Sequence, residues 1–154
     1  MKIIRSSKCS IKYSTSSKQK QLKIILKEYK NVVNFFINLF YENPINKLEL
    51  LKDIIDKSDS WFSYRMKVVA AREALDMLKS SYALTEENKK ELLEKAEQAE
   101  TEKQKNKYIS NANSLKPKKP KHHGERMCLS TNISELQLSN TKEFDAWLHL
   151  LIRI

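Results

Sequence analysis

The sequence predicts an α+β fold in which a helical lobe is inserted between strands near the two ends of the chain. Apolar residues recur every three or four positions through the middle of the 154-residue sequence, as in amphipathic helices. Near both ends they alternate with polar residues, as in half-exposed strands. One glycine and three prolines favour long regular elements. We expect residues 20–108 to form the helical lobe, and residues 1–19 and 109–154 to form a β lobe.

The N-terminal part of the chain predicts a strand followed by a long helix. The strand covers residues 8–14, and its polar side carries Lys8 and Lys12. A stretch rich in helix-capping serines follows. From residue 22 to residue 40 the apolar positions form the stripe of an amphipathic helix, which should end near Pro44 because a residue before proline disfavours helical geometry. This helix is the first member of a predicted small bundle.

Three further helical segments are expected. A short helix covers residues 45–57, and the polar residues at 58–60 offer an N-cap for the next one. In residues 61–82 the apolar positions follow a strict three-four alternation, which predicts a narrow seam packed against the first helix. Thr85 then caps a charged segment. Residues 85–108 are therefore predicted to be a solvated projecting helix or an insertion.

The C-terminal part predicts a linker and a return to strands. Residues 111–126 form the linker, because two prolines and the single glycine break regular structure there. Alternation returns in residues 127–133 and predicts a strand, while the apolar run 144–154 fits either a helix or a strand. The linker also concentrates positive charge on Lys116, Lys118, Lys119, Lys121 and Arg126.

The charge of the chain favours a polyanionic partner. Twenty-nine Lys and Arg residues against 19 Asp and Glu leave a net charge of +10. The excess lies at the ends, because residues 1–30 hold nine basic residues and one acid, and residues 109–154 hold seven basic residues and four acids. Nucleic acid is the commonest partner of such a protein, and an anionic membrane surface is the next.

Composition also points away from membranes, metals and cofactors. Cys9 and Cys128 are too few and too far apart for a zinc site or a disulfide framework. The N-terminus lacks the apolar stretch of a secretory signal, and no apolar run approaches the ~18 residues of a membrane span. We expect a cytoplasmic protein without a cofactor.

Basic residues in three places are the candidate nucleic-acid contacts. Lysines of the linker can neutralise phosphates, and two adjacent histidines can donate hydrogen bonds or stack on bases. Each group also has a structural explanation, as a solvated linker or as the exposed face of a helix. The candidates are Lys8 and Lys12 on the first strand, Arg65, Lys67 and Arg72 on the third helix, and Lys116, Lys118, Lys119, Lys121, His122, His123 and Arg126 in the linker.

The sequence offers no catalytic site. His122 and His123 are adjacent in a loop, whereas the paired histidines of a relaxase-type transposase alternate around an apolar residue on a strand. A nuclease centre needs carboxylates that converge from different elements around metal ions. The acidic pairs of this chain, such as Asp53 with Asp56, lie on helix faces predicted to be exposed.

Several segments carry a resemblance to a known family. They are the basic first strand with the helix 22–40, the helix 68–82, and above all the passage Lys116–Leu129. This passage resembles a family pattern of proline, lysines, glycine, methionine and leucine in that order. Residues 144–148 are similar to a segment that shortly precedes the family's next strand. Apart from the charged residues 85–107, the chain resembles the N-terminal half of TnpB, the transposon-encoded OrfB-type proteins akin to type V CRISPR nucleases.

The resemblance implies both a fold and a function. In this family the region forms a β-barrel-like lobe interrupted by a helical recognition lobe, and both grip guide RNA and target DNA. The family's RuvC metal centre and its zinc ribbon follow this region and have no counterpart here. We therefore expect a non-catalytic, truncated part of an RNA-guided DNA endonuclease, whose partners are RNA, DNA and a separate C-terminal nuclease half.

Two other functions remain open at the level of the sequence. The three-four seam of residues 61–82 would suit a helical protein-protein interaction module, in which the positive charge only aids solubility. A small transposase of the relaxase type would require metal-dependent nicking. Salt separates the first alternative from nucleic-acid binding, because phosphate contacts weaken steeply with ionic strength while apolar pairing does not.

Overall fold

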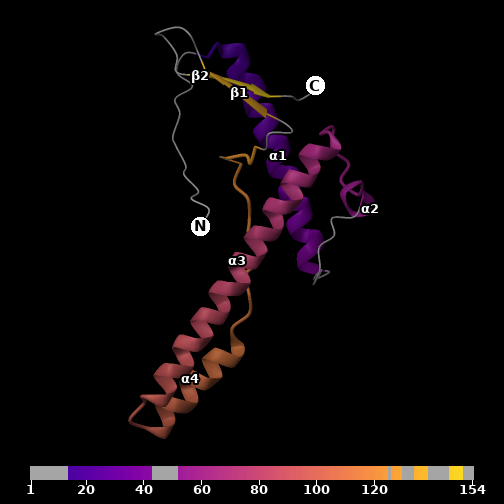
Figure 1. The fold of residues 1–154 in the computed structure, drawn as a ribbon. Coiled ribbons are helices and arrows are strands. Elements are labelled where there is room, and N and C mark those ends of the chain that lie inside the picture. The colour runs from indigo at the N-terminus through magenta and orange to yellow at the C-terminus, as the bar shows by residue number, and fades with distance from the viewer. Residues whose placement is uncertain (1–13, 43–51, 125, 130–133, 139–145, 151–154) are drawn as a thin grey trace.

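The computed structural model describes residues 14–42, 52–124, 126–129, 134–138 and 146–150. Within them the protein is mostly helical, with one small sheet (Figure 1). The elements in chain order are α1 (Ser16–Glu42), α2 (Lys52–Ile55), α3 (Tyr64–Glu97), α4 (Glu102–Ser114), β1 (Ser134–Leu138) and β2 (Ala146–Leu150).

Helix α1 confirms the long amphipathic helix that the apolar stripe predicts. It begins before the stripe because the Thr15 hydroxyl accepts a hydrogen bond from the backbone N–H of Lys18 at 3.4 Å, as an N-cap does. Seven residues of this helix between Ile25 and Phe40 are buried, and the side chains of Tyr29, Val33 and Phe36 have no exposed surface. One face of α1 therefore forms half of the core.

Helix α3 joins two segments that the sequence separates. It begins at the N-cap Ser63, whose hydroxyl accepts from the N–H of Met66, and not at residues 58–60. The predicted break at Thr85 is wrong, because the Thr85 hydroxyl donates to the carbonyl of Ser81 at 2.8 Å. A threonine that bonds back to the preceding turn satisfies its own polar group inside a helix. The helix therefore continues for 34 residues.

The core lies between α1 and the first half of α3. The α3 face that meets α1 is lined by three fully buried alanines, Ala70, Ala71 and Ala74, which let the two backbones approach closely. The predicted seam of residues 61–82 is only partly correct. Its aromatic ends Trp61 and Tyr82 are exposed, because the buried face is rotated toward the alanines and Met66.

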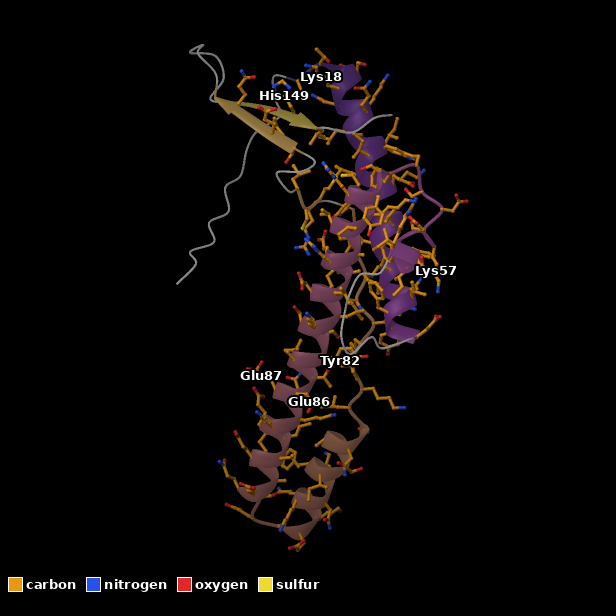
Figure 2. The ribbon with its side chains drawn as sticks, turned by 45° about the vertical axis from the view of Figure 1, so that its right-hand side comes forward. Lys18, Lys57, Tyr82, Glu86, Glu87 and His149 are labelled. Atoms are coloured by element: carbon orange, nitrogen blue, oxygen red, sulfur yellow. The ribbon has the colours of Figure 1, made fainter. Side chains whose placement is uncertain are left out.

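Helix α4 folds back against the second half of α3. Thr101 caps it by accepting a hydrogen bond from the N–H of Gln104 at 3.3 Å, and Ala112 is buried. The two helices form a projecting hairpin, and Figure 2 shows Glu86 and Glu87 on its α3 arm. Because α4 runs to Ser114, the predicted linker start at residue 111 and the predicted end of the helical lobe at residue 108 are both too early.

The C-terminal strands form a two-stranded antiparallel hairpin in which Leu136 is the partner of Leu148. The apolar run 144–154 fitted either a helix or a strand, and its described residues 146–150 form strand β2. Of the strand predicted at 127–133, residues 127–129 are not a strand, and residues 130–133 lie outside the described residues. The first described strand begins at Ser134. The described residues contain this one small sheet and show no barrel. The hairpin lies beside the N-terminal half of α1 in both views (Figures 1 and 2).

Some predictions concern parts of the chain outside the described residues. The first strand at 8–14, with Lys8, Cys9 and Lys12, is one of them. The short helix predicted at 45–57 is another, because its residues 45–51 lie outside the described residues. In its remaining part, α2 covers Lys52–Ile55.

Candidate nucleic-acid interface

The basic segment, Lys116–Lys121, is held by its backbone against the two long helices. The hydroxyl of Tyr41 on α1 donates to the carbonyl of Pro117 at 3.1 Å, and the hydroxyl of Ser81 on α3 donates to the carbonyl of Lys118. All four lysine side chains remain exposed. The ammonium of Lys119 lies 5.5 Å from the centre of the Tyr41 ring. The segment is therefore an anchored backbone that presents its charges to solvent.

A two-point hydrogen bond holds the end of this segment. The side-chain amide of Asn34 on α1 donates to the carbonyl of His122 at 3.0 Å and accepts from its N–H at 2.9 Å. The same amide also donates to the carbonyl of Lys30 at 2.9 Å, which fixes its orientation. An amide that pairs with both backbone groups of one residue holds that residue as a neighbouring strand would.

The side chain of His122 points into the core toward a buried carboxylate. It is 2% exposed, and its Nδ1 accepts from the N–H of Gly124 at 3.2 Å, so the proton of the neutral ring lies on Nε2. Nε2 is 3.5 Å from Oε1 of Glu73 on α3. His122 is a predicted nucleic-acid contact, but this burial gives it an anchoring role and leaves it outside the exposed surface.

Glu73 is the centre of a buried polar cluster. Its Oε2 accepts from the Tyr29 hydroxyl at 2.7 Å, and its Oε1 accepts from Nε of Arg126 at 3.2 Å. The N–H of Cys128 in turn donates to the Tyr29 oxygen at 3.4 Å. The cluster thus ties α1, α3 and the chain after the basic segment to one carboxylate.

Burial sets the protonation of the groups around this carboxylate. It lowers the pKa of His122. The negative charge of Glu73 acts in the opposite direction, and repulsion from Arg126, His123 and Lys30 adds to the lowering. Burial raises the pKa of Tyr29, and the hydrogen bond to Glu73 raises it further. It also raises the pKa of the Cys128 thiol, with Glu73 adding to the effect. His122, Tyr29 and Cys128 are therefore neutral near pH 7.

This arrangement predicts that His122 makes stability depend on pH. Because its folded pKa is below the unfolded value of about 6.5, the unfolded chain binds more protons once the pH falls below that value. The free energy of unfolding should then decrease, by up to about 1.4 kcal/mol per pH unit, until the folded pKa is passed. Urea denaturation between about pH 7.5 and about pH 5.5, one unit either side of the unfolded pKa, measures it.

The control for this prediction is the neighbouring histidine. His122→Gln should flatten the decrease in stability, whereas His123→Gln should preserve it because His123 is exposed. An unchanged slope in His122→Gln would show that other groups produce the pH dependence.

Lysines of α1 extend the positive surface beyond the basic segment. Lys20, Lys23, Lys27 and Lys30 follow a three-four-three spacing, which places them on the flank of α1 that also carries Asn34. Lys20, Lys23 and Lys27 are exposed. Gly124, at a φ of 86°, packs its backbone on the Lys30 side chain, where an added Cβ would lie 3.0 Å from Cδ. The basic surface is defined as the four lysines of the basic segment together with these four of α1.

The remaining predicted contacts lie elsewhere on α3 or beside the segment. Arg65 is exposed near the start of α3, and the ammonium of Lys67 donates to the carbonyl of Ser58 at 2.7 Å. Arg72 is brought together with Arg126 at a groove described below. His123 is exposed, while Lys8 and Lys12 are outside the described residues.

A groove of about 720 Å³ is lined on one side by α3 and on the other by Pro120, Arg126 and Cys128. Its apolar surface comes from Val69, Met77 and Pro120. Four charged residues also line it, namely Arg72, Glu73, Asp76 and Arg126. Ser80 completes the α3 wall, and its hydroxyl donates to the carbonyl of Asp76 at 2.8 Å. The groove therefore combines apolar surface with both hydrogen-bond donors and acceptors.

Sequence reasoning missed the groups that anchor the segment. Glu73 could have been found, because this carboxylate lies three residues after Ala70 on the face of α3 that becomes buried. Asn34 and Tyr41 carry no such signal, since a polar side chain on the flank of a helix is ordinarily solvated.

The described ranges contain no group of three His, Cys, Asp or Glu residues placed to hold a metal ion. No helix among them has the length and apolar character to cross a membrane. Comparisons with protein-family models, with curated proteins and with solved structures found no match.

Proposed function

We propose that this chain binds nucleic acid through the basic surface. One observation carries the proposal, namely that the backbone of the basic segment is held by α1 and α3 while its four lysines stay exposed. Four ammonium groups within six residues suit the closely spaced phosphates of a nucleic-acid strand. Lysine makes such contacts without a demand for a particular base, so the binding is expected to tolerate different sequences.

Anchoring favours binding over the alternative of a solvated linker. A free linker would lose backbone entropy when it settles on a partner, which costs about 1–2 kcal/mol per residue ordered. Here hydrogen bonds from Tyr41, Ser81 and Asn34 already hold the segment in the free protein. A preorganised surface retains more of its interaction energy as affinity.

The interaction module that the three-four seam suggests is less well supported. Ala71 and Leu78 in the middle of that seam are buried in the core shared with α1. A partner helix would have to displace α1 to reach them. Trp61 and Tyr82 are exposed but lie at the opposite ends of the seam.

The finer proposal is that this chain is the guide-RNA and target-DNA binding region of a TnpB-like, RNA-guided DNA endonuclease encoded by a transposon. Its support is the similarity of the passage Lys116–Leu129 to the family's pattern, together with a helical region that precedes that passage. In this proposal the nuclease chemistry belongs to another part of the parent protein or to a separate chain. The chain itself would position the RNA and the DNA.

A salt series tests the proposed binding. The affinity for a structured RNA and for duplex DNA should fall steeply with salt, with a log-log slope of about −0.9 per phosphate neutralised on duplex DNA. Changing Lys116, Lys118, Lys119 and Lys121 together to Gln should reduce that slope by about 3 to 4. Fluorescence anisotropy with labelled nucleic acid measures both quantities.

A matched variant removes the same charge elsewhere. Lys90, Lys103, Lys105 and Lys107 are exposed on the projecting hairpin, and changing them to Gln lowers the net charge equally. This control should keep most of the slope, because its lysines lie away from the basic surface. Equal weakening by both variants would mean that only net charge matters, and no binding at low salt by the folded chain would contradict the proposal.

A further inference from the structure

We infer that the groove beside the basic segment receives an unpaired base, so that the preferred ligand is single-stranded nucleic acid. The inference rests on the proposed function, because it names the form of nucleic acid that the basic surface binds. It comes from the chemistry of the groove, which differs from that of the surface next to it.

The charges inside the groove cancel, whereas those at its edge do not. Arg72 and Arg126 are offset by Glu73 and Asp76, so the lining has no formal net charge. A phosphate would therefore gain little net attraction inside it. Pro120 forms one wall and is flanked in the chain by the exposed lysines of the basic segment. Phosphates should therefore bind at the edge of the groove, and an uncharged group should bind inside it.

The lining offers a nucleobase both apolar surface and hydrogen-bonding groups. Apolar surface from Val69, Met77 and Pro120 can contact the flat face of a base. Asp76 can accept from base amino groups, and a guanidinium can donate to ring nitrogens or stack on the base. Arg126 gives its Nε to Glu73, but its side chain is 69% exposed, which leaves its terminal N–H groups accessible to a ligand.

Base pairing decides which form of nucleic acid can use this groove. In a duplex the faces of the bases are stacked and their pairing edges are occupied, so entry would require unpairing. In a single strand both are available, and stacking on a protein surface does not depend strongly on sequence. The volume of about 720 Å³ has room for one nucleotide and its solvent.

The experiment compares single-stranded RNA of about 12 nucleotides, carrying one fluorescent 2-aminopurine, with the same sequence in a duplex. At one salt concentration the single strand should bind at least about 5-fold more tightly, and the 2-aminopurine emission should change on binding. Ser80→Leu enlarges an exposed side chain in the groove wall. It should weaken single-strand binding by about 5- to 100-fold and leave duplex binding unchanged.

Ser110→Leu is the matched control, because Ser110 is exposed on α4 outside the groove lining. It should leave both affinities unchanged, and circular dichroism should show that both variants keep the helical content of the parent. Equal binding of single strand and duplex by the parent, with a steep salt dependence, would overturn this inference and leave the proposed function standing. Absence of salt-sensitive binding to either form would overturn the proposed function itself.

Discussion

Replacing Phe36 with alanine is expected to lower the free energy of unfolding by about 3–5 kcal/mol. The ring of Phe36 has no exposed surface and stacks on Phe40, with 5.6 Å between ring centres and 19° between planes. The facing side of α3 is lined by alanines, which have no side-chain length to move into the space left behind. Urea denaturation followed by circular dichroism measures the loss.

The neighbouring phenylalanine is the control. Phe35 meets Phe36 edge to face, but the residue is 37% exposed. Phe35→Ala should therefore cost clearly less than Phe36→Ala, because part of the side chain is already in contact with water and no enclosed cavity forms. Similar losses for the two variants would contradict the placement of α1 against α3.

Replacing Glu73 with leucine is expected to lower the free energy of unfolding by about 2–5 kcal/mol. The Tyr29 hydroxyl donates to this carboxylate in the core and would be left without its partner. Nε2 of His122 has no hydrogen-bond partner among the described residues, and it would also lose the carboxylate oxygen that lies 3.5 Å away. A buried polar group that loses its partner costs about 1–3 kcal/mol. Arg126 adds little, because its exposed side chain can turn to water.

Asp76→Leu, one turn along α3, is the matched control, because Asp76 is exposed and should tolerate the change. Glu73→Gln is expected to fall between the two, since an amide offers one acceptor oxygen where the carboxylate offers two. If Glu73→Leu were as stable as the parent chain, the polar cluster would not contribute to the fold.

The same substitution links stability to the proposed function. Glu73 faces His122, whose backbone is paired with Asn34 at the end of the basic segment. Folded Glu73→Leu protein should therefore bind nucleic acid more weakly than the parent chain although every lysine is present. Unchanged affinity in the folded variant would show that the Asn34 pair alone holds the segment.

Local patterns predicted α1 well because its signal is strong and complete. Nineteen residues of unbroken apolar periodicity, bounded by serines and by Pro44, predict a single long amphipathic helix. The charge of the segment after Ser114 was equally evident, because four lysines in six residues need no structure to be counted. The start of α3 was predicted less well, because the polar residues at 58–60 were expected to cap it and Ser63 does so instead.

Predictions failed where a residue has two satisfactory environments. Thr85 is a good N-cap, yet it also completes its hydrogen bonding inside a helix by donating to Ser81. The choice depended on whether α4 would pack along the continued helix, which is a contact between distant parts of the chain. A related reason applies to residues 127–129, which were expected to begin a strand and do not form one. Alternation indicates a possible strand, but pairing decides where one forms.

Residue periodicity and residue counts were enough to predict the helical part of the core, the excess of positive charge and the place of that charge in a segment interrupted by prolines. That this segment is anchored could not be predicted in this way, because its partners Tyr41, Ser81 and Asn34 are 37 to 88 residues away in the chain. The tertiary structure also places His122 so that it faces Glu73 and not solvent. Hydrogen bonds between such distant residues depend on how the helices pack, and no local pattern records that packing.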